Sequence, residues 1–98
     1  MEHVLITSEL KEAIHRMDEN KEAVFKKVTH CLTYMSECMS AIRDIQDNHM
    51  RQRIAILCRD ESLKRVNKDK RLPEDVKILC RSSIVSMFRK TMKETGCH

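Results

Sequence analysis

Five cysteines and five histidines are the residues of this 98-residue chain that could bind a metal or supply a nucleophile. A histidine and a cysteine are adjacent in the sequence at two places, His30-Cys31 and Cys97-His98. Zinc sites take their ligands from short spacings such as C-x-x-C or H-x-x-x-H, and neither spacing occurs here. We therefore expect no metal and no cofactor.

Four of the cysteines, Cys31, Cys38, Cys58 and Cys80, fall on the apolar positions of helical patterns. A cysteine in such a place packs as a small hydrophobic residue, whereas a reactive thiolate needs an exposed, electropositive setting. The odd number of cysteines disfavours a closed disulfide framework and favours free thiols in a reducing compartment. Since the chain also lacks a glycine-rich phosphate loop and a distinctive carboxylate pair, we expect no catalytic residue and no enzymatic activity.

A basic cluster is the strongest candidate for a binding site. Its residues are Lys64, Arg65, Lys68, Lys70 and Arg71, and the apolar Leu72 follows them. Such a cluster is either a solvated loop that keeps the protein soluble or an electropositive rim that holds acidic peptides. Leu72 would then be the apolar anchor of the site, or a staple that fixes the start of the next helix.

The composition favours helices and one domain. The chain is 41% hydrophobic and 35% charged, with a single glycine and a single proline, so the tight turns of hairpins are scarce. We predict an all-α fold, a compact bundle of four to six helices, as one domain over residues 1–98. The net charge of +4 permits an acidic partner but is too small to indicate nucleic acid. We see no signal peptide and no membrane-spanning run.

Apolar residues recur at steps of three and four from Leu10 to Ile45. This spacing predicts helix, and it also resembles the seam of a coiled coil. One helix over 10–45 would be roughly 54 Å long, too long for a compact domain of this size. We therefore expect a break at Asp18–Asn20 or at Ser36, unless the chain pairs with another.

The second half of the chain contains the clearer helix ends. Asp47-Asn48 is predicted to end one helix and cap the next, a short one over 49–58. Asp60 is then predicted to cap a very short helix, followed by a loop over 67–71. The final helix is predicted over 73–94, because proline suits the first position and Gly96 a C-terminal stop. Its inward face is predicted to be Val76, Leu79, Cys80, Ile84, Met87 and Phe88. If the Phe88 ring is central, Phe88→Ala should cost roughly 3–5 kcal/mol.

The region 36–93 resembles the N-terminal domain family of transcription elongation factor S-II (TFIIS), which also occurs in elongin A, a Mediator subunit and the integrase-binding domain of lens epithelium-derived growth factor. Three segments carry the resemblance. They are Cys38–Ile45, Ser62-Leu63-Lys64-Arg65-Val66 with the basic loop after it, and the final helix with Leu79-Cys80-Arg81-Ser82-Ser83-Ile84 and Phe88-Arg89-Lys90. Residues 1–32 have no counterpart and are expected to form an extra or extended first helix.

The resemblance implies a right-handed bundle of about five helices in a nuclear protein of transcription elongation or chromatin. It also implies a scaffold function: binding of acidic, hydrophobic-anchored motifs in disordered segments of partner proteins. We expect a monomer without small-molecule or membrane partners. The main alternative is a helical coiled-coil dimerisation module. A third and weaker alternative is a basic helical domain that binds nucleic acid. It is weaker because no exposed helix carries a convincing set of polar side chains that could hydrogen-bond to bases.

Overall fold

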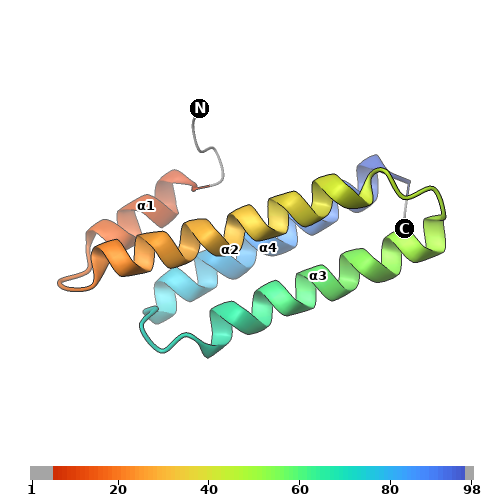
Figure 1. Ribbon diagram of the computed structural model, residues 1–98. Helices are drawn as coiled ribbons and strands as arrows, with labels where there is room; N and C mark the ends of the chain where they lie inside the picture. Colours follow the sequence, from red (N-terminus) through yellow and green to blue (C-terminus); the bar gives the residue numbers. More distant parts are fainter. Residues whose placement is uncertain (1–5, 97–98) are drawn as a thin grey trace.

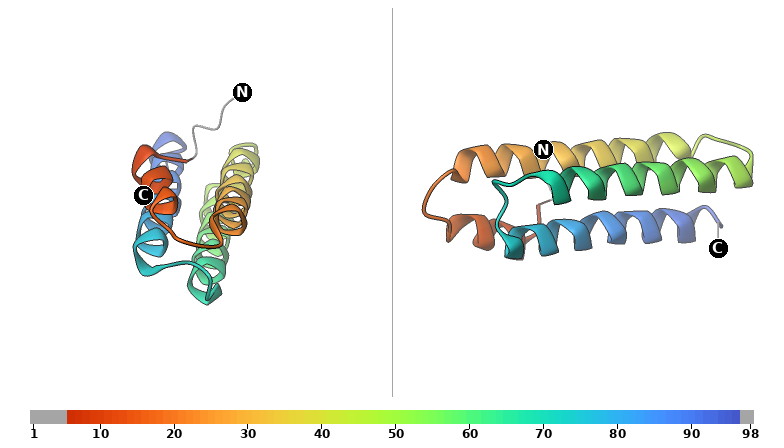
Figure 2. Two further views of the ribbon diagram at one scale, coloured as in Figure 1. Left: turned by 90° about the vertical axis from the view of Figure 1, so that its left-hand side faces the viewer. Right: turned by 90° about the horizontal axis from the view of Figure 1, so that it is seen from below.

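Four α-helices run back and forth along one long axis in the computed structural model, which describes residues 6–96 (Figure 1). The helices are α1 (Ser8–His15), α2 (Lys21–Ile42), α3 (Asn48–Lys68) and α4 (Glu74–Glu94). The three long helices pack against one another, and α1 lies against α2 and α4 (Figure 2). The molecule measures 46 × 28 × 17 Å. The predicted all-α bundle is confirmed, with four helices in the described part.

The predicted helix break in the first half of the chain is confirmed between α1 and α2. Asn20 adopts a left-handed backbone conformation with a φ of 63°, which asparagine tolerates better than most residues. The other predicted break, at Ser36, is wrong, because α2 continues through that residue. The cap at Asp47 is confirmed. Its Oδ1 accepts hydrogen bonds from the backbone N–H groups of His49 at 2.9 Å and Met50 at 3.2 Å.

The prediction of two short helices between residues 49 and 68 is wrong, because α3 is continuous. Asp60 lies within it on the solvent side and forms a 3.0 Å ion pair with Arg59. An aspartate caps a new helix only where the preceding helix has already ended. No glycine or proline ends the helix in this stretch. Helical spacing therefore outweighs the local preference of Asp60.

The final helix ends where it was predicted to end and begins one residue later than predicted, at Glu74. Pro73 is the N-cap, and Gly96, with a φ of 77°, follows the last turn. Its face differs in part from the prediction. The side chains that are buried are Val76, Cys80, Ile84, Thr91 and Met92. Leu79, Met87 and Phe88 are only partly buried at the edge of the core. Val76, Cys80 and Ile84 are therefore confirmed on the inward face, and the Phe88 ring is not central.

The α2–α3 contact is close because the buried residues of α3 are small. They are Ala55, Ser62 and Val66. The hydroxyl of Ser62 donates a hydrogen bond to the Sδ atom of Met35 across the interface at 3.6 Å. This contact fixes the register of the two antiparallel helices, and it satisfies a polar group that would otherwise be buried without a partner.

Candidate functional site

The predicted basic cluster lies at the C-terminal end of α3 and in the loop to α4. Lys64, Lys68 and Lys70 are exposed, and no acidic side chain pairs with them among residues 6–96. Arg65 is held more firmly. Its guanidinium lies over the Tyr34 ring at 4.5 Å from the centroid, and its Nε donates to Glu61 at 3.1 Å. Three free lysines are therefore available to an acidic partner.

Asp69 organises the loop and forms an ion pair with Arg71, the last cation of the cluster. Its carboxylate accepts hydrogen bonds from the backbone N–H of Arg71 at 2.9 Å and from the guanidinium at 3.2 and 3.3 Å. Lys27 of α2 lies 3.8 Å away. The hydrogen bonds from Arg71 lower the pKa of Asp69 below its usual value. Arg71 therefore contributes to the loop structure and adds less positive charge to the surface than the lysines do.

Leu72 is only 4% exposed and belongs to the hydrophobic core. This burial agrees with its alternative role, in which the residue fixes the entry into α4. An apolar anchor for a partner requires an accessible side chain, so the anchor has to lie elsewhere.

A groove between α3 and α4 supplies accessible apolar side chains. Its volume is about 890 Å³, and it is open to solvent. The apolar lining comes from Leu63 of α3 and from Ile78 and Val85 of α4. Ile78 is 53% exposed. The cations that line it are Arg81, Arg89, Lys90 and Lys93.

The groove carries net positive charge. Arg81 pairs with Glu74 at 3.4 Å and donates to the side-chain oxygen of Asn67 at 2.7 Å. The other three cations, Arg89, Lys90 and Lys93, have no ion-pair partner within residues 6–96. Because Asn67 lies next to Lys68, the hydrogen bond from Arg81 brings the groove beside the basic cluster. The groove therefore begins near the end of α3, where the basic cluster lies.

Sequence reasoning did not find this groove. It assigned the final helix a single inward face. One signal was present: Ile78 and Val85 lie seven residues apart, two turns of one helix face, and away from the buried face. Apolar residues on two faces of a helix indicate a second surface that can be covered.

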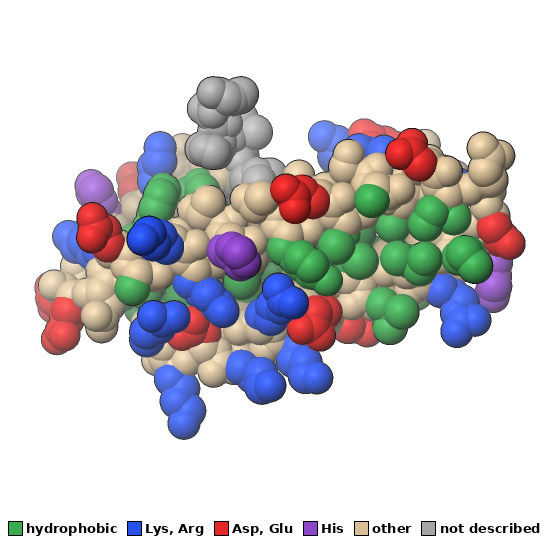
Figure 3. Space-filling model, in the orientation of Figure 1, with side chains coloured by type: hydrophobic (Ala, Val, Ile, Leu, Met, Phe, Trp, Pro, Cys, Tyr) green, Lys and Arg blue, Asp and Glu red, His purple; other side chains and the backbone are tan. Residues whose placement is uncertain are grey.

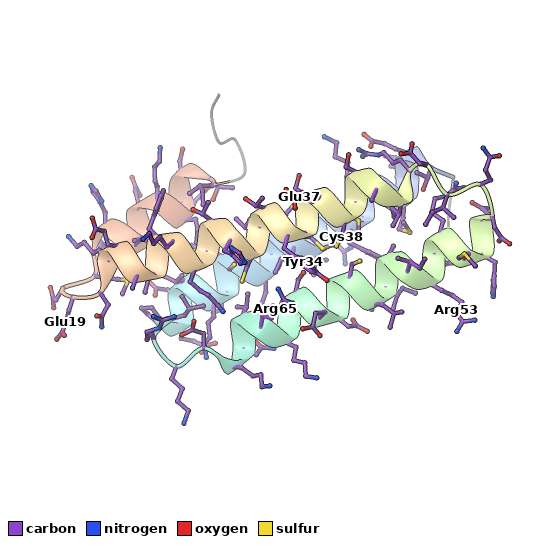
Figure 4. All side chains as sticks on the ribbon, in the orientation of Figure 1. Glu19, Tyr34, Glu37, Cys38, Arg53 and Arg65 are labelled. Carbon is purple, nitrogen blue, oxygen red and sulfur yellow. The ribbon has the colours of Figure 1, made fainter. Side chains whose placement is uncertain are left out.

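A cluster of tyrosine, cysteine and arginine side chains lies where α2 and α3 meet (Figure 4). Burial, together with a hydrogen bond to Cys38, raises the pKa of Cys58 to about 12. On α4, burial likewise raises the pKa of the core residue Cys80 to about 12. The hydrogen bond to Cys38 also raises the pKa of Tyr34. Groups held in their neutral forms are poor nucleophiles and poor bases at neutral pH, so this cluster serves packing.

No three histidine, cysteine or acidic side chains within residues 6–96 are grouped so that they could hold a metal ion. The Cys97–His98 pair lies outside the described residues. None of the described helices is long and apolar enough to cross a membrane. No family model, curated protein or solved structure matches this chain.

Proposed function

We propose that this chain is a protein-interaction domain that binds acidic, hydrophobic-anchored segments of transcription- or chromatin-associated proteins in the nucleus. The observation that carries the proposal is the α3–α4 groove, in which apolar side chains lie beside cations without acidic partners. The protein class rests on the resemblance of residues 36–93 described above.

The groove meets the physical requirements of such a ligand. A disordered segment loses conformational entropy when it binds, so it needs an apolar side chain in a groove to offset that loss. Leu63, Ile78 and Val85 offer the apolar surface. Acidic residues next to the anchor would then meet Lys90 and Lys93, and further acids would reach the lysines at the end of α3.

The test is a two-dimensional NMR titration of the full chain with an amphipathic acidic peptide. Its control peptide has the same apolar residues, with glutamine and asparagine in place of the acids. We expect the acidic peptide to shift the amides of Leu63 and of residues 78–93, and the control peptide to bind much more weakly.

A variant within the groove makes the test specific. Val85→Glu places a carboxylate among the anchor residues, and we expect it to weaken peptide binding by about tenfold or more. Lys11→Glu, on the exposed side of α1, should leave binding unchanged. Shifts confined to other surfaces would contradict the proposed site. Binding of a short DNA or RNA duplex, without binding of any acidic peptide, would favour the nucleic-acid alternative.

A further inference from the structure

The surface formed by α2 and α3, which we call the α2–α3 face, is divided along its length into an apolar half and a basic half. In Figure 3, hydrophobic side chains gather on the right of this face, and lysines and arginines gather on its left. The apolar half consists of Tyr34, Cys38, Ala41, Met50, Ile54 and Leu57, and the basic half of Lys26, Lys27, Lys64 and Lys68. None of these residues lines the α3–α4 groove.

The apolar half is exposed. Leu57 is 66% exposed and Met50 is 53% exposed. Within residues 6–96, α1 packs on α2 and α4 and leaves this half uncovered. On both helices its members follow steps of four and three along the chain, the spacing at which a partner helix places its own anchors. Glu37 and Arg53 project outward in Figure 4, so these charges lie at its edges.

The basic half contains cations that no acidic side chain neutralises. Lys27 lies 3.8 Å from Asp69 and is thus partly compensated. By contrast, Lys26, Lys64 and Lys68 are exposed and form no ion pair within the described chain. These three charges come from the start of α2 and the end of α3, which lie together because the two helices are antiparallel (Figure 1). An acidic partner would therefore find unpaired cations at this end of the face.

The boundary between the two halves is held in place by side-chain contacts. The Arg65 guanidinium lies over the Tyr34 ring at 4.5 Å from the centroid, and Arg65 also pairs with Glu61 at 3.1 Å. Tyr34, Cys38 and Arg65 come together between α2 and α3 in Figure 4. Because these contacts join the two helices, the halves keep a fixed position relative to each other.

We infer that the α2–α3 face binds a helix of a partner protein whose contact side is apolar toward one end and acidic toward the other. Such a helix matches both halves at once. A second copy of this chain would set the basic half against itself or against the other copy's apolar half, and neither arrangement neutralises its charge. A nucleic acid is anionic along its whole length, and a bilayer separates charge from hydrocarbon by depth, whereas here the two halves lie end to end.

The length of the face determines the length of the partner helix. The helices α2 and α3 have 22 and 21 residues, so each is about 32 Å long. A partner helix that lies along both needs about 20 residues, with roughly three turns over each half. Three apolar turns alone would bury little surface, so the acidic turns are needed for both affinity and orientation.

The first experiment titrates the full chain with designed helical peptides of about 20 residues. In the split peptides, leucines occupy one side of half the helix and glutamates the same side of the other half, in either order along the chain. The interleaved peptide has the same composition, with leucines and glutamates alternating along that side. We expect one split peptide to shift the amides of residues 34–41 and 50–68 in two-dimensional NMR spectra, and the interleaved peptide to bind at least about tenfold more weakly.

Matched variants then locate the site, with binding read from the amides of residues 34–41 and 50–57. Met50→Glu should weaken binding of the split peptide about tenfold or more, whereas Ile78→Glu, at an equally exposed residue of the groove, should not. Lys26→Glu should weaken it about threefold to tenfold, and Lys11→Glu on α1 should have little effect. Glutamate suits the first turn of α3, so Met50→Glu should keep its helical content in circular dichroism.

Several results would overturn the inference. They are the absence of shifts with both split peptides, equal binding of the split and interleaved peptides, or equal effects of Met50→Glu and Ile78→Glu. A dimer of the chain alone that Met50→Glu dissociates would assign the face to a second copy. Binding to vesicles of anionic phospholipid, without binding of peptide, would assign it to a membrane. Shifts confined to residues 78–93 would overturn this inference and leave the proposed function standing, and shifts confined to the α2–α3 face would do the reverse.

Discussion

Asp69 connects the loop after α3 with α2, because its carboxylate accepts hydrogen bonds from Arg71 of its own loop and lies near Lys27 of α2. Its side chain is 8% exposed, so solvent screens these contacts little. We predict that Asp69→Asn lowers the free energy of unfolding at pH 7 by about 1–2 kcal/mol in urea denaturation. Asp60→Asn is the control. Its side chain is 58% exposed, and its loss should change stability by less than about 0.5 kcal/mol.

The same residue makes stability depend on pH. The pKa of Asp69 is lower in the folded chain than its ordinary value of 3.8. Its stabilising effect is therefore complete above that ordinary value and is lost as the pH falls through the folded pKa. The wild type should lose stability more steeply than Asp69→Asn as the pH falls below about 4. Parallel curves for the two proteins would contradict this assignment.

Ile84 and Phe88 of α4 both fall on the apolar face of the sequence pattern, but they differ in depth of burial. Ile84 is fully buried, whereas Phe88 lies at the edge of the core under the Arg59 guanidinium, 4.6 Å from the ring centroid. We predict that Ile84→Ala costs about 2–5 kcal/mol in chemical denaturation. Phe88→Ala should cost about 1–2 kcal/mol, from partial burial and the lost cation–π contact. A larger loss for Phe88→Ala would return that ring to the centre of the core.

Helix ends were predictable from the sequence because they depend on single residues. Asp47 as a cap, Pro73 at the start of α4 and the break before Lys21 follow from local backbone and hydrogen-bond chemistry. The continuity of α3 through Asp60 was not predicted, because a residue that caps helices in one context is neutral on an exposed helix face in another.

Relations between helices were harder to predict. The basic cluster was found from its sequence, since its members all lie in the short stretch 64–71. The α3–α4 groove was not, because Leu63 comes from one helix and Val85 from another. Burial of Leu72 likewise depends on how the loop packs, and local pattern allowed either an exposed anchor or a buried staple. Tertiary packing decides between such alternatives.

For the whole molecule, the uneven charge distribution sets how fast an acidic partner arrives. We predict that reversing Lys68 and Lys70 together to glutamate slows peptide association about threefold to tenfold at low salt and flattens its salt dependence. Stopped-flow kinetics across a series of salt concentrations measures both effects. The dissociation rate should change little, because the apolar anchor controls release.

The matched control reverses Lys11 on α1 and Arg53 near the start of α3, which gives the same net charge. If this control slows association equally, net charge alone governs the rate, and the position of the basic cluster has no special role. The shape of the molecule makes the distinction measurable. Because the long dimension of 46 Å exceeds the screening length of about 8 Å at physiological salt several-fold, distant charges contribute little.

The small buried residues of α3 have an evolutionary consequence. The core constrains Ala55, Ser62 and Val66 most strongly, and most other positions of this helix reach solvent at least in part. Substitutions at the exposed positions among them would leave the packing nearly intact, whereas Ile54, Cys58 and Leu63 still contact the core. After a gene duplication, the two descendants could therefore diverge in what they recognise by changing α3 alone, while natural selection on foldability preserves α2 and α4.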